Sequence, residues 1–245
     1  MNPAVQSISA FFPCYNDEAT IGRMVEVAAR AIDETGVDGE IIVINDGSSD
    51  GSAEVLARTA TTEPRLRVVT HPENRGYGGA LLSGFAAATR QWIFYTDGDA
   101  QFDPAELANL VEVATDDVDV VNGYKIRRAD NVARRVIGRV YHRFVAFMFG
   151  LEIRDTDCDF RLIRKSALDR ITLEHTTGVI CVELVRKLQD SGARFVEVPV
   201  HHYAREYGQS EFFRFTSVAR SLKDLVGLWF REVLLRRGRT PSDDG

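Results

Sequence analysis

The chain has 245 residues, of which 44% are hydrophobic and 27% are charged. This is ordinary globular composition, and it excludes a mostly disordered, collagenous or coiled-coil chain. The formal net charge of −6 is unevenly distributed: residues 1–122 hold 7 Lys/Arg and 20 Asp/Glu (−13), and residues 123–245 hold 23 and 16 (+7). The acidic first half is a poor partner for nucleic acid, whereas the basic second half suits phosphates or an anionic lipid surface.

The first half of the chain alternates apolar runs with segments of helical spacing. Strands alternating with helices in this way indicate βαβ units, and therefore an α/β fold with a mostly parallel sheet. Ligands of such sheets bind beyond the C-terminal ends of the strands. The predicted strands are 7–13, 40–44, 66–69, 92–95 and 118–121, and the predicted helices are 17–35, 52–60, 77–89 and 104–114.

The second half is less regular, with helices predicted at 132–149, 179–189 and 216–237 and a strand at 195–201. No repeat or Pro/Gly linker interrupts the chain, so we expect a single domain over 1–238 and a disordered tail at 239–245. Only 3 cysteines occur, widely spaced, which argues against a disulfide framework and fits a reducing compartment. There is no secretory signal and no apolar stretch of about 18 residues, so we expect a protein that is soluble or lies on a membrane surface.

Two polar clusters follow the first two predicted strands. The first contains Tyr15, Asn16 and Glu18, and the second contains Asp46 and Ser48 among glycines and further hydroxyl residues. A short acid beside small residues can accept hydrogen bonds from a base or a ribose, and glycine lets the backbone approach a ligand closely. The alternative is a tight turn followed by a helix cap.

A third cluster, N-R-G-Y-G-G-A at 74–80, lies between a strand and a helix and contains Arg75 and Gly78. Its spacing fails the dinucleotide fingerprint, because the third glycine of G-x-G-x-x-G would fall at Leu81. The helix N-terminus still favours a diphosphate.

The fourth cluster contains Asp97, Asp99 and Gln101, directly after the strand W-I-F-Y. Two carboxylates two residues apart can face one hard cation, and Mg²⁺ or Mn²⁺ held in this way usually completes its coordination with substrate phosphates. The alternative is an acidic turn in which Asp99 or Asp103 caps the helix that begins at Pro104.

Together the four clusters resemble the nucleotide-sugar half of a family 2 glycosyltransferase with the GT-A fold, over roughly residues 7–125. The resemblance implies a Rossmann-like sheet with helices on both faces and a C-terminal amphipathic helical extension. It assigns 1–122 to the nucleotide sugar and 123–238 to the acceptor and membrane. It places Mg²⁺ or Mn²⁺ at Asp97, Asp99 and Gln101. The nucleotide contacts it implies are Pro13, Tyr15, Asn16, Glu18, Asp46, Ser48, Arg75, Gly78 and Asp97.

V-N-G-Y-K at 121–125 and D-T-D-C-D-F-R at 155–161 look like the polyprenyl-phosphate sugar transferase branch, which includes dolichyl-phosphate mannose synthase. That branch usually has lysine where this chain has Glu211. A phosphate acceptor is already anionic, so it needs positioning and charge neutralisation rather than a base. The candidate phosphate ligands are Lys125, Arg127, Arg128, Arg205, Ser210 and Arg214, and the candidate catalytic residues are Asp99, Lys125, Asp155, Asp157 and Arg205.

Two alternatives concern single features of the second half. Asp155 or Asp157 could be a general base for a hydroxyl acceptor, or Asp155 could form a salt bridge with Arg154, Arg161 or Arg164. The apolar and basic stripes of helices 132–149 and 216–237 suit an interfacial surface, or packing in the core or between subunits.

The sequence therefore predicts a metal-dependent, inverting transferase that moves a sugar from a nucleotide diphosphate sugar to a polyprenyl phosphate. GDP-mannose is favoured as donor and UDP-sugars stay open. We expect the protein to be cytoplasmic and peripheral at the inner face of the membrane, and a homo-oligomer is left open. The rival functions are a soluble family 2 enzyme acting on a hydroxyl and a non-catalytic nucleotide-sugar-binding protein.

Overall fold

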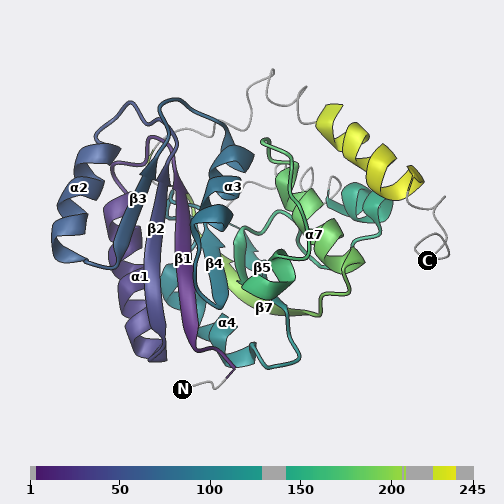
Figure 1. Cartoon of the computed structure of the whole chain (residues 1–245), viewed down its shortest axis with the longest axis horizontal. Helices are drawn as coiled ribbons and strands as arrows, with labels where there is room; N and C mark the ends of the chain where they lie inside the picture. The colour runs from purple at the N-terminus through teal and green to yellow at the C-terminus, as the bar shows by residue number, and fades with distance from the viewer. Residues whose placement is uncertain (1–3, 129–141, 206, 208–222, 236–245) are drawn as a thin grey trace.

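The computed structural model describes residues 4–128, 142–205, 207 and 223–235. Its centre is a seven-stranded sheet with the strand order β3-β2-β1-β4-β6-β5-β7 (Figure 1). The strands are β1 (Ser7–Cys14), β2 (Asp38–Asn45), β3 (Leu66–Thr70), β4 (Trp92–Thr96), β5 (Val120–Arg128), β6 (Phe160–Arg164) and β7 (Phe195–His202).

The sheet is mostly parallel, as predicted. β1 pairs in parallel with β2 and β4, β2 with β3, and β5 with β7. Only β6 runs antiparallel to its neighbours, β4 and β5. The prediction did not include β6, and it ended β5 at residue 121, whereas the strand continues to Arg128.

Helices cover both faces of the sheet, which confirms the α/β class. The α-helices are α1 (Ile21–Thr35), α2 (Ser52–Thr62), α3 (Tyr77–Ala87), α4 (Leu107–Val113), α6 (Lys165–Leu168) and α7 (Ile180–Asp190). A 3₁₀ helix, η1 (Pro104–Glu106), and a π-helix, η3 (Phe230–Leu235), accompany them.

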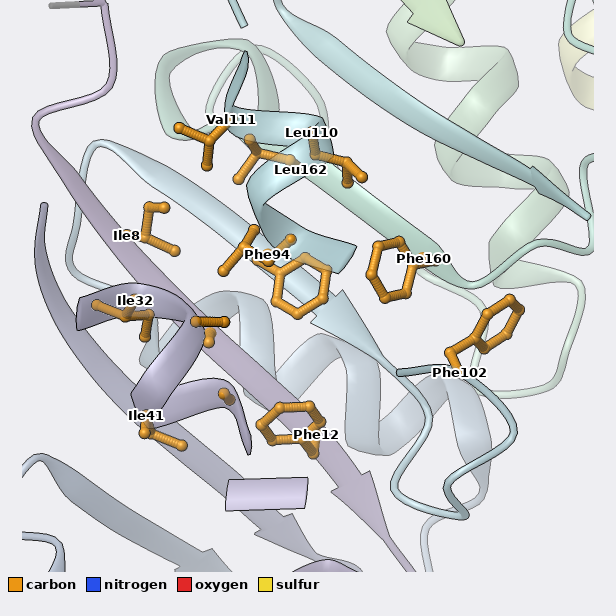
Figure 2. Packing of buried hydrophobic residues seen from close by; sticks show 14 of the residues in the cluster. Ile8, Phe12, Ile32, Ile41, Phe94, Phe102, Leu110, Val111, Phe160 and Leu162 are labelled. Atoms are coloured by element: carbon orange, nitrogen blue, oxygen red, sulfur yellow. The ribbon is translucent and has the colours of Figure 1, made fainter. Parts of the chain in front are cut away.

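Alternate residues of the central strands supply two separate cores. Ile8 and Phe12 of β1 pack with α1 and α4 on one face, as Figure 2 shows, and Phe11 packs with α3 on the other. Because both faces are buried, β1 reads as a continuous apolar run rather than as an alternating one. The same alternation places Phe94 of β4 in the core that contains Phe12, whereas Tyr95 stacks on Phe11 in the other core.

Two helix starts differ from the predicted ones. α1 begins at Ile21 rather than at 17, because the carbonyl of Asp17 closes a turn by accepting the amides of Thr20 (3.0 Å) and Ile21 (2.9 Å). The helix predicted at 104 starts with η1, which Asp103 caps by accepting the Ala105 amide at 3.0 Å. Of the two predicted capping residues, Asp103 therefore takes this role.

A third apolar cluster joins α7 to two helical stretches, 142–149 and 223–235. Figure 1 shows these stretches side by side, and the Trp229 indole donates a hydrogen bond to the Met148 carbonyl at 2.9 Å. The remainder of the predicted helices 132–149 and 216–237, and the predicted tail at 239–245, lie outside the described residues. None of the described helices is long and apolar enough to cross a bilayer.

Gly84 of α3 offers a test of the close packing of α3 on β1. A Cβ at Gly84 would lie 2.3 Å from Cε2 of Phe11, whose ring packs between Phe85 and Tyr95. We expect Gly84→Ala to lower the free energy of unfolding by about 1–3 kcal/mol, although alanine is the better helix former. Denaturant unfolding measures the change.

The matched control is Gly227→Ala. This helical glycine is exposed, and among the described residues nothing lies within 4 Å of the position that a Cβ would take there. The control should be neutral or stabilising by up to about 1 kcal/mol. Equal stabilisation by both substitutions would show that contact with Phe11 does not limit residue 84.

Candidate functional site

The loops that follow β1 and β2 are joined through Asn16. Its backbone φ is 58°, and its amide donates to the Ser48 hydroxyl at 3.0 Å. Its side-chain oxygen accepts the Ser49 amide at 2.8 Å. Two of the predicted nucleotide-binding residues, Asn16 and Ser48, are therefore brought into direct contact at the C-terminal edge of the sheet.

Glu18 and Asp50 form a second link between these loops. The Glu18 amide donates to Asp50 at 3.0 Å, and the Glu18 carboxylate accepts the Gly51 amide at 2.7 Å. These contacts show that Glu18 holds the second loop in place. Its predicted contact with a nucleotide stays a prediction.

Asp17 is a further acid at this edge, and it was not among the predicted site residues. Its carboxylate accepts the Tyr15 amide at 3.0 Å. Burial raises the pKa of Asp17 to about 6, and Asp99 and Asp50 also raise it, whereas the Tyr15 amide and Arg205 oppose the shift. No local signal in the sequence distinguishes Asp17 from Glu18.

Asp46 joins the second cluster to the third. Its carboxylate is buried, and Oδ1 accepts a hydrogen bond from the His71 ring at 2.6 Å and from the Arg75 amide at 2.9 Å. The Gly78 amide donates to the Thr176 carbonyl at 2.9 Å, and a Cβ at Gly78 would lie 2.5 Å from the Thr176 carbonyl carbon. The predicted residues Asp46, Arg75 and Gly78 thus lie close together: the Asp46 side chain binds the amide of Arg75, and Gly78 follows three residues later at the start of α3.

Asp97 and Asp99 follow β4, at the same edge. The Tyr77 hydroxyl donates to Asp97 at 2.8 Å. Burial raises the pKa of Asp97 well above its ordinary value, and the neighbouring Asp159 and Asp99 raise it further. Asp99 is buried, and its Oδ1 accepts the Gln101 amide at 3.0 Å while its Oδ2 pairs with Arg205.

Arg205 reaches Asp99 because the segment after β7 is attached to the loop after β4. The Tyr203 amide donates to the Gln101 carbonyl at 2.8 Å, and the Gln101 side-chain amide donates to the Tyr203 carbonyl at 3.2 Å. Two predicted residues 106 positions apart, Asp99 and Arg205, therefore form an ion pair.

The donor set at this position suits a hard divalent cation. Within 4–128, 142–205, 207 and 223–235, no three His, Cys, Asp or Glu side chains converge as a group able to hold an ion. Mg²⁺ and Mn²⁺ are often held by one or two carboxylates, with phosphate oxygens and water completing the coordination. Asp97 and Asp99 fit that arrangement, and the pKa of Asp97 is raised first by burial and then by the neighbouring carboxylates of Asp159 and Asp99, whose charge a cation would offset.

Lys125 of β5 lies beside the loop that carries Asp155 and Asp157. Its amide is 3.5 Å from the Asp155 carboxylate, and its ammonium donates to the Asp157 carbonyl. Burial raises the pKa of Asp157, and Lys125 opposes this shift.

The three arginines suggested as partners of Asp155 make their bonds elsewhere. Arg154 pairs with Glu197, Arg161 pairs with Asp159, and Arg164 donates to backbone carbonyls. The salt-bridge alternative for Asp155 with these arginines is therefore wrong, and its role as a base stays a prediction.

Four predicted acceptor residues are placed only in part or not at all. Arg127 and Arg128 lie in β5, which pairs with β7. Ser210 and Arg214 lie outside the described residues, as does Glu211.

The loop segment that packs on Gly78, which includes His175 and Thr176, is held by a buried carboxylate. Glu183 of α7 accepts hydrogen bonds from the His175 ring (2.9 Å) and the Lys187 ammonium (2.7 Å). Burial alone would raise the pKa of Glu183, but the hydrogen bonds from His175, Lys187 and nearby amides outweigh it and lower the pKa to about 2.

Comparisons with known proteins agree on a family. Residues 9–172 match the family described as Glycosyl transferase family 2. The chain is 30% identical over 225 residues to the undecaprenyl-phosphate 4-deoxy-4-formamido-L-arabinose transferase of Enterobacter sp. (strain 638), and the match covers 91% of this chain and 67% of that protein.

Solved structures agree on the fold. Glucosyl-3-phosphoglycerate synthase from Mycobacterium tuberculosis, in complex with Mn²⁺, uridine-diphosphate and phosphoglyceric acid, is similar with a TM-score of 0.68 and 19% identity, over 97% of this chain and 80% of that one. A mannosyltransferase from Pyrobaculum calidifontis, in complex with GDP-Man and Mn²⁺, is similar with a TM-score of 0.65 and 20% identity, over 91% and 64%. The expected GT-A fold is confirmed.

The lowered pKa of Glu183 predicts how stability depends on pH. A carboxylate whose pKa is depressed in the folded state stabilises that state above its unfolded pKa, and this contribution disappears as pH falls toward the folded pKa. We expect Glu183→Gln to be clearly less stable than the wild type at pH 7, with the difference shrinking between about pH 4.5 and pH 2. Urea unfolding at several pH values measures it, and a difference independent of pH would contradict the prediction.

Proposed function

The chain belongs to glycosyl transferase family 2, and we propose that it transfers a sugar from a nucleotide diphosphate sugar to the phosphate of a polyprenyl phosphate. The observation that carries this proposal is the meeting of Asp97 and Asp99 with two basic side chains, Lys125 and Arg205, at one edge of the sheet. The carboxylates suit a cation on the leaving diphosphate. The basic groups suit an anionic acceptor, which needs positioning rather than deprotonation.

Asp97, Asp99 and Gln101 would hold Mg²⁺ or Mn²⁺. When bound, the cation neutralises the charge that develops on the departing nucleoside diphosphate. Arg205 pairs with Asp99 Oδ2 in this structure, and with a cation at Asp99 its guanidinium would be available to a phosphate. With the acceptor phosphate attacking in line, a single displacement inverts the anomeric centre.

The loops that carry Tyr15, Asp46 and Arg75 would hold the nucleotide, in agreement with their positions at the strand ends. The resemblance favours mannose carried on GDP. The solved neighbours named above include complexes with uridine-diphosphate and with GDP-Man, and the named relative transfers a modified arabinose. The sugar is therefore a question for direct assay.

The raised pKa of Asp157 favours the second candidate, a transferase for a hydroxyl acceptor. Burial raises the pKa of this carboxyl, which is a property of general bases. Transfer to lipid phosphate that survives in Asp157→Asn would exclude this role.

The transfer reaction is tested with purified protein, Mg²⁺ or Mn²⁺, and radiolabelled GDP-mannose, UDP-glucose or UDP-GlcNAc, each with and without a short polyprenyl phosphate. We expect label to enter the organic phase only when the lipid phosphate is present. Asp99→Ala should lower the rate at least 100-fold, because the charge of the leaving group is no longer neutralised.

The matched control for that assay is Asp116→Ala, which removes an exposed carboxylate from the loop before β5, at the edge of the sheet opposite the end of β4. Its rate should stay within about twofold of the wild type. Donor hydrolysis or transfer to added alcohols, without lipid-dependent transfer from any donor, would contradict the polyprenyl acceptor.

We also propose that the helical stretches 142–149 and 223–235 dock peripherally on the cytoplasmic face of a membrane. Large apolar side chains are exposed on both stretches, and Phe147 is 85% exposed. Basic residues such as Arg143 and Arg231 accompany them, a combination typical of interfacial helices. The exposed apolar residues are Phe144, Phe147, Val226, Phe230 and Leu234.

Vesicle sedimentation tests this docking. We expect Phe147→Ser to lower the fraction bound to anionic vesicles at least threefold, because a large apolar side chain no longer enters the interface. Phe147→Trp is the conservative control and should retain binding. Equal binding by wild type and Phe147→Ser, with unchanged melting temperatures, would rule out this surface.

A further inference from the structure

Among the described residues, hydrogen bonds reach only one of the two carboxylate oxygens of Asp46. Its amide donates to the Cys14 carbonyl at 2.9 Å, which fixes the backbone at the end of β2 against the end of β1. Its side chain is buried, and both hydrogen bonds that reach it, from His71 and from the Arg75 amide, end on Oδ1. Among the described residues, no hydrogen bond reaches Oδ2.

His71 is the residue that imposes this asymmetry, and no motif in the sequence includes it. It follows β3, and its amide donates to the Asn45 carbonyl at 2.9 Å, so the loop after β3 is attached to the loop after β2. Its ring lies between Asp46 and Ser83 of α3, with Nδ1 2.6 Å from Asp46 Oδ1 and Nε2 2.9 Å from the Ser83 hydroxyl.

The chemistry of Asp46 fixes the role of one ring nitrogen. A carboxylate only accepts, so His71 Nδ1 carries the proton that it donates to Asp46. The Ser83 hydroxyl can both donate and accept, so it pairs with Nε2 in either protonation state of the ring. Ser83 thus orients His71, and His71 orients the Asp46 carboxylate.

The position of the Asp46 carboxylate suits contact with a nucleobase. Asp46 lies where the loops after β1, β2 and β3 meet, and these loops carry Tyr15, Ser48 and Arg75. Gly47, with φ +70°, packs so tightly on the third loop that a Cβ there would lie 2.7 Å from the Asn74 amide. Small loop residues in contact at the strand ends form the place where a nucleotide binds in open α/β sheets.

We propose that His71 and Ser83 determine which base the donor carries, by leaving Asp46 one free acceptor oxygen, and that the base is a pyrimidine dione, uracil or thymine, rather than guanine. Uracil presents a single donor, N3–H, which one oxygen satisfies. Guanine presents two adjacent donors, N1–H and the N2 amino group, which a carboxylate satisfies with both oxygens. With Oδ1 already committed to His71 and Arg75, a guanine would keep one buried donor unpaired, which disfavours binding.

This inference rests on the proposed function, because it assumes that Asp46 faces the donor base. It departs from the expectation of GDP-mannose that the sequence resemblance favoured.

Titration calorimetry with Mn²⁺ and free nucleoside diphosphates tests the proposal without any acceptor. We expect UDP to bind at least tenfold more tightly than GDP. The diphosphate of N3-methyluridine should bind at least tenfold more weakly than UDP, because the methyl group replaces the only donor. Inclusion of dTDP separates uracil from thymine. The two bases present the same N3–H edge, but UDP carries ribose and dTDP carries deoxyribose.

His71→Ala removes one of the two hydrogen bonds to Asp46 Oδ1 and leaves only that from the Arg75 amide, so the UDP preference over GDP should fall to less than about threefold. His71→Asn still offers an N–H near the position of Nδ1 and should restore most of the preference. A purely structural role for His71 would weaken both nucleotides equally and leave their ratio unchanged, which would overturn the proposal. Melting temperatures verify that each variant is folded.

The remaining outcomes separate this inference from the proposed function. GDP binding as tightly as UDP, or full tolerance of the N3-methyl group, would overturn the role of His71 and Ser83 but leave the transferase proposal standing. Binding of no nucleotide at all by the folded wild-type protein would remove both.

Discussion

One buried cation, Arg161, holds together the two halves of the sheet. A guanidinium with 1% of its surface exposed is tolerated only when it is paired and hydrogen-bonded. Its Nε donates to Asn122 of β5 at 2.6 Å, and Nη1 pairs with Asp159 at 3.0 Å. The Tyr95 hydroxyl of β4 and the Thr156 carbonyl complete its contacts. The strand where the sheet reverses direction and the loop before it are therefore fixed against the end of β4.

That constraint places several carboxylates close together at the candidate site. Asp159 raises the pKa of Asp97, as does Asp99, and Asp99 in turn raises the pKa of Asp17. Arg205 is the cation that compensates Asp99 within the chain itself. Such an edge favours whatever brings positive charge to it.

The donor side of the site and the apolar helical surface share one support, the segment 174–177. Its Thr176 carbonyl accepts the Gly78 amide, its Thr177 hydroxyl donates to Asp224 at 3.0 Å, and His175 lies 3.1 Å from Arg231. Residues 223–235 are thus attached by side-chain contacts to the loop that packs on the start of α3. These contacts hold the loop beside Gly78 and the apolar helical surface in a fixed relation.

The sequence by itself determined the α/β class, the strands of the first half and the polar clusters at their ends. These features depend on local apolar runs, on helical spacing and on turn residues, all of which are short-range properties. Three features were decided only by the tertiary structure. β6 escaped prediction because its buried Arg161 is stable only through partners 39 and 66 residues away. Asp17 and Glu18 are neighbouring acids that the sequence does not tell apart. Only the burial of Asp17 close to Asp99 distinguishes them. His71 belongs to no motif, and it acquires a role only because packing of the loop after β3 brings it to Asp46, 25 residues earlier. Hydrogen bonding and charge compensation between distant residues are set by packing, which no local pattern encodes.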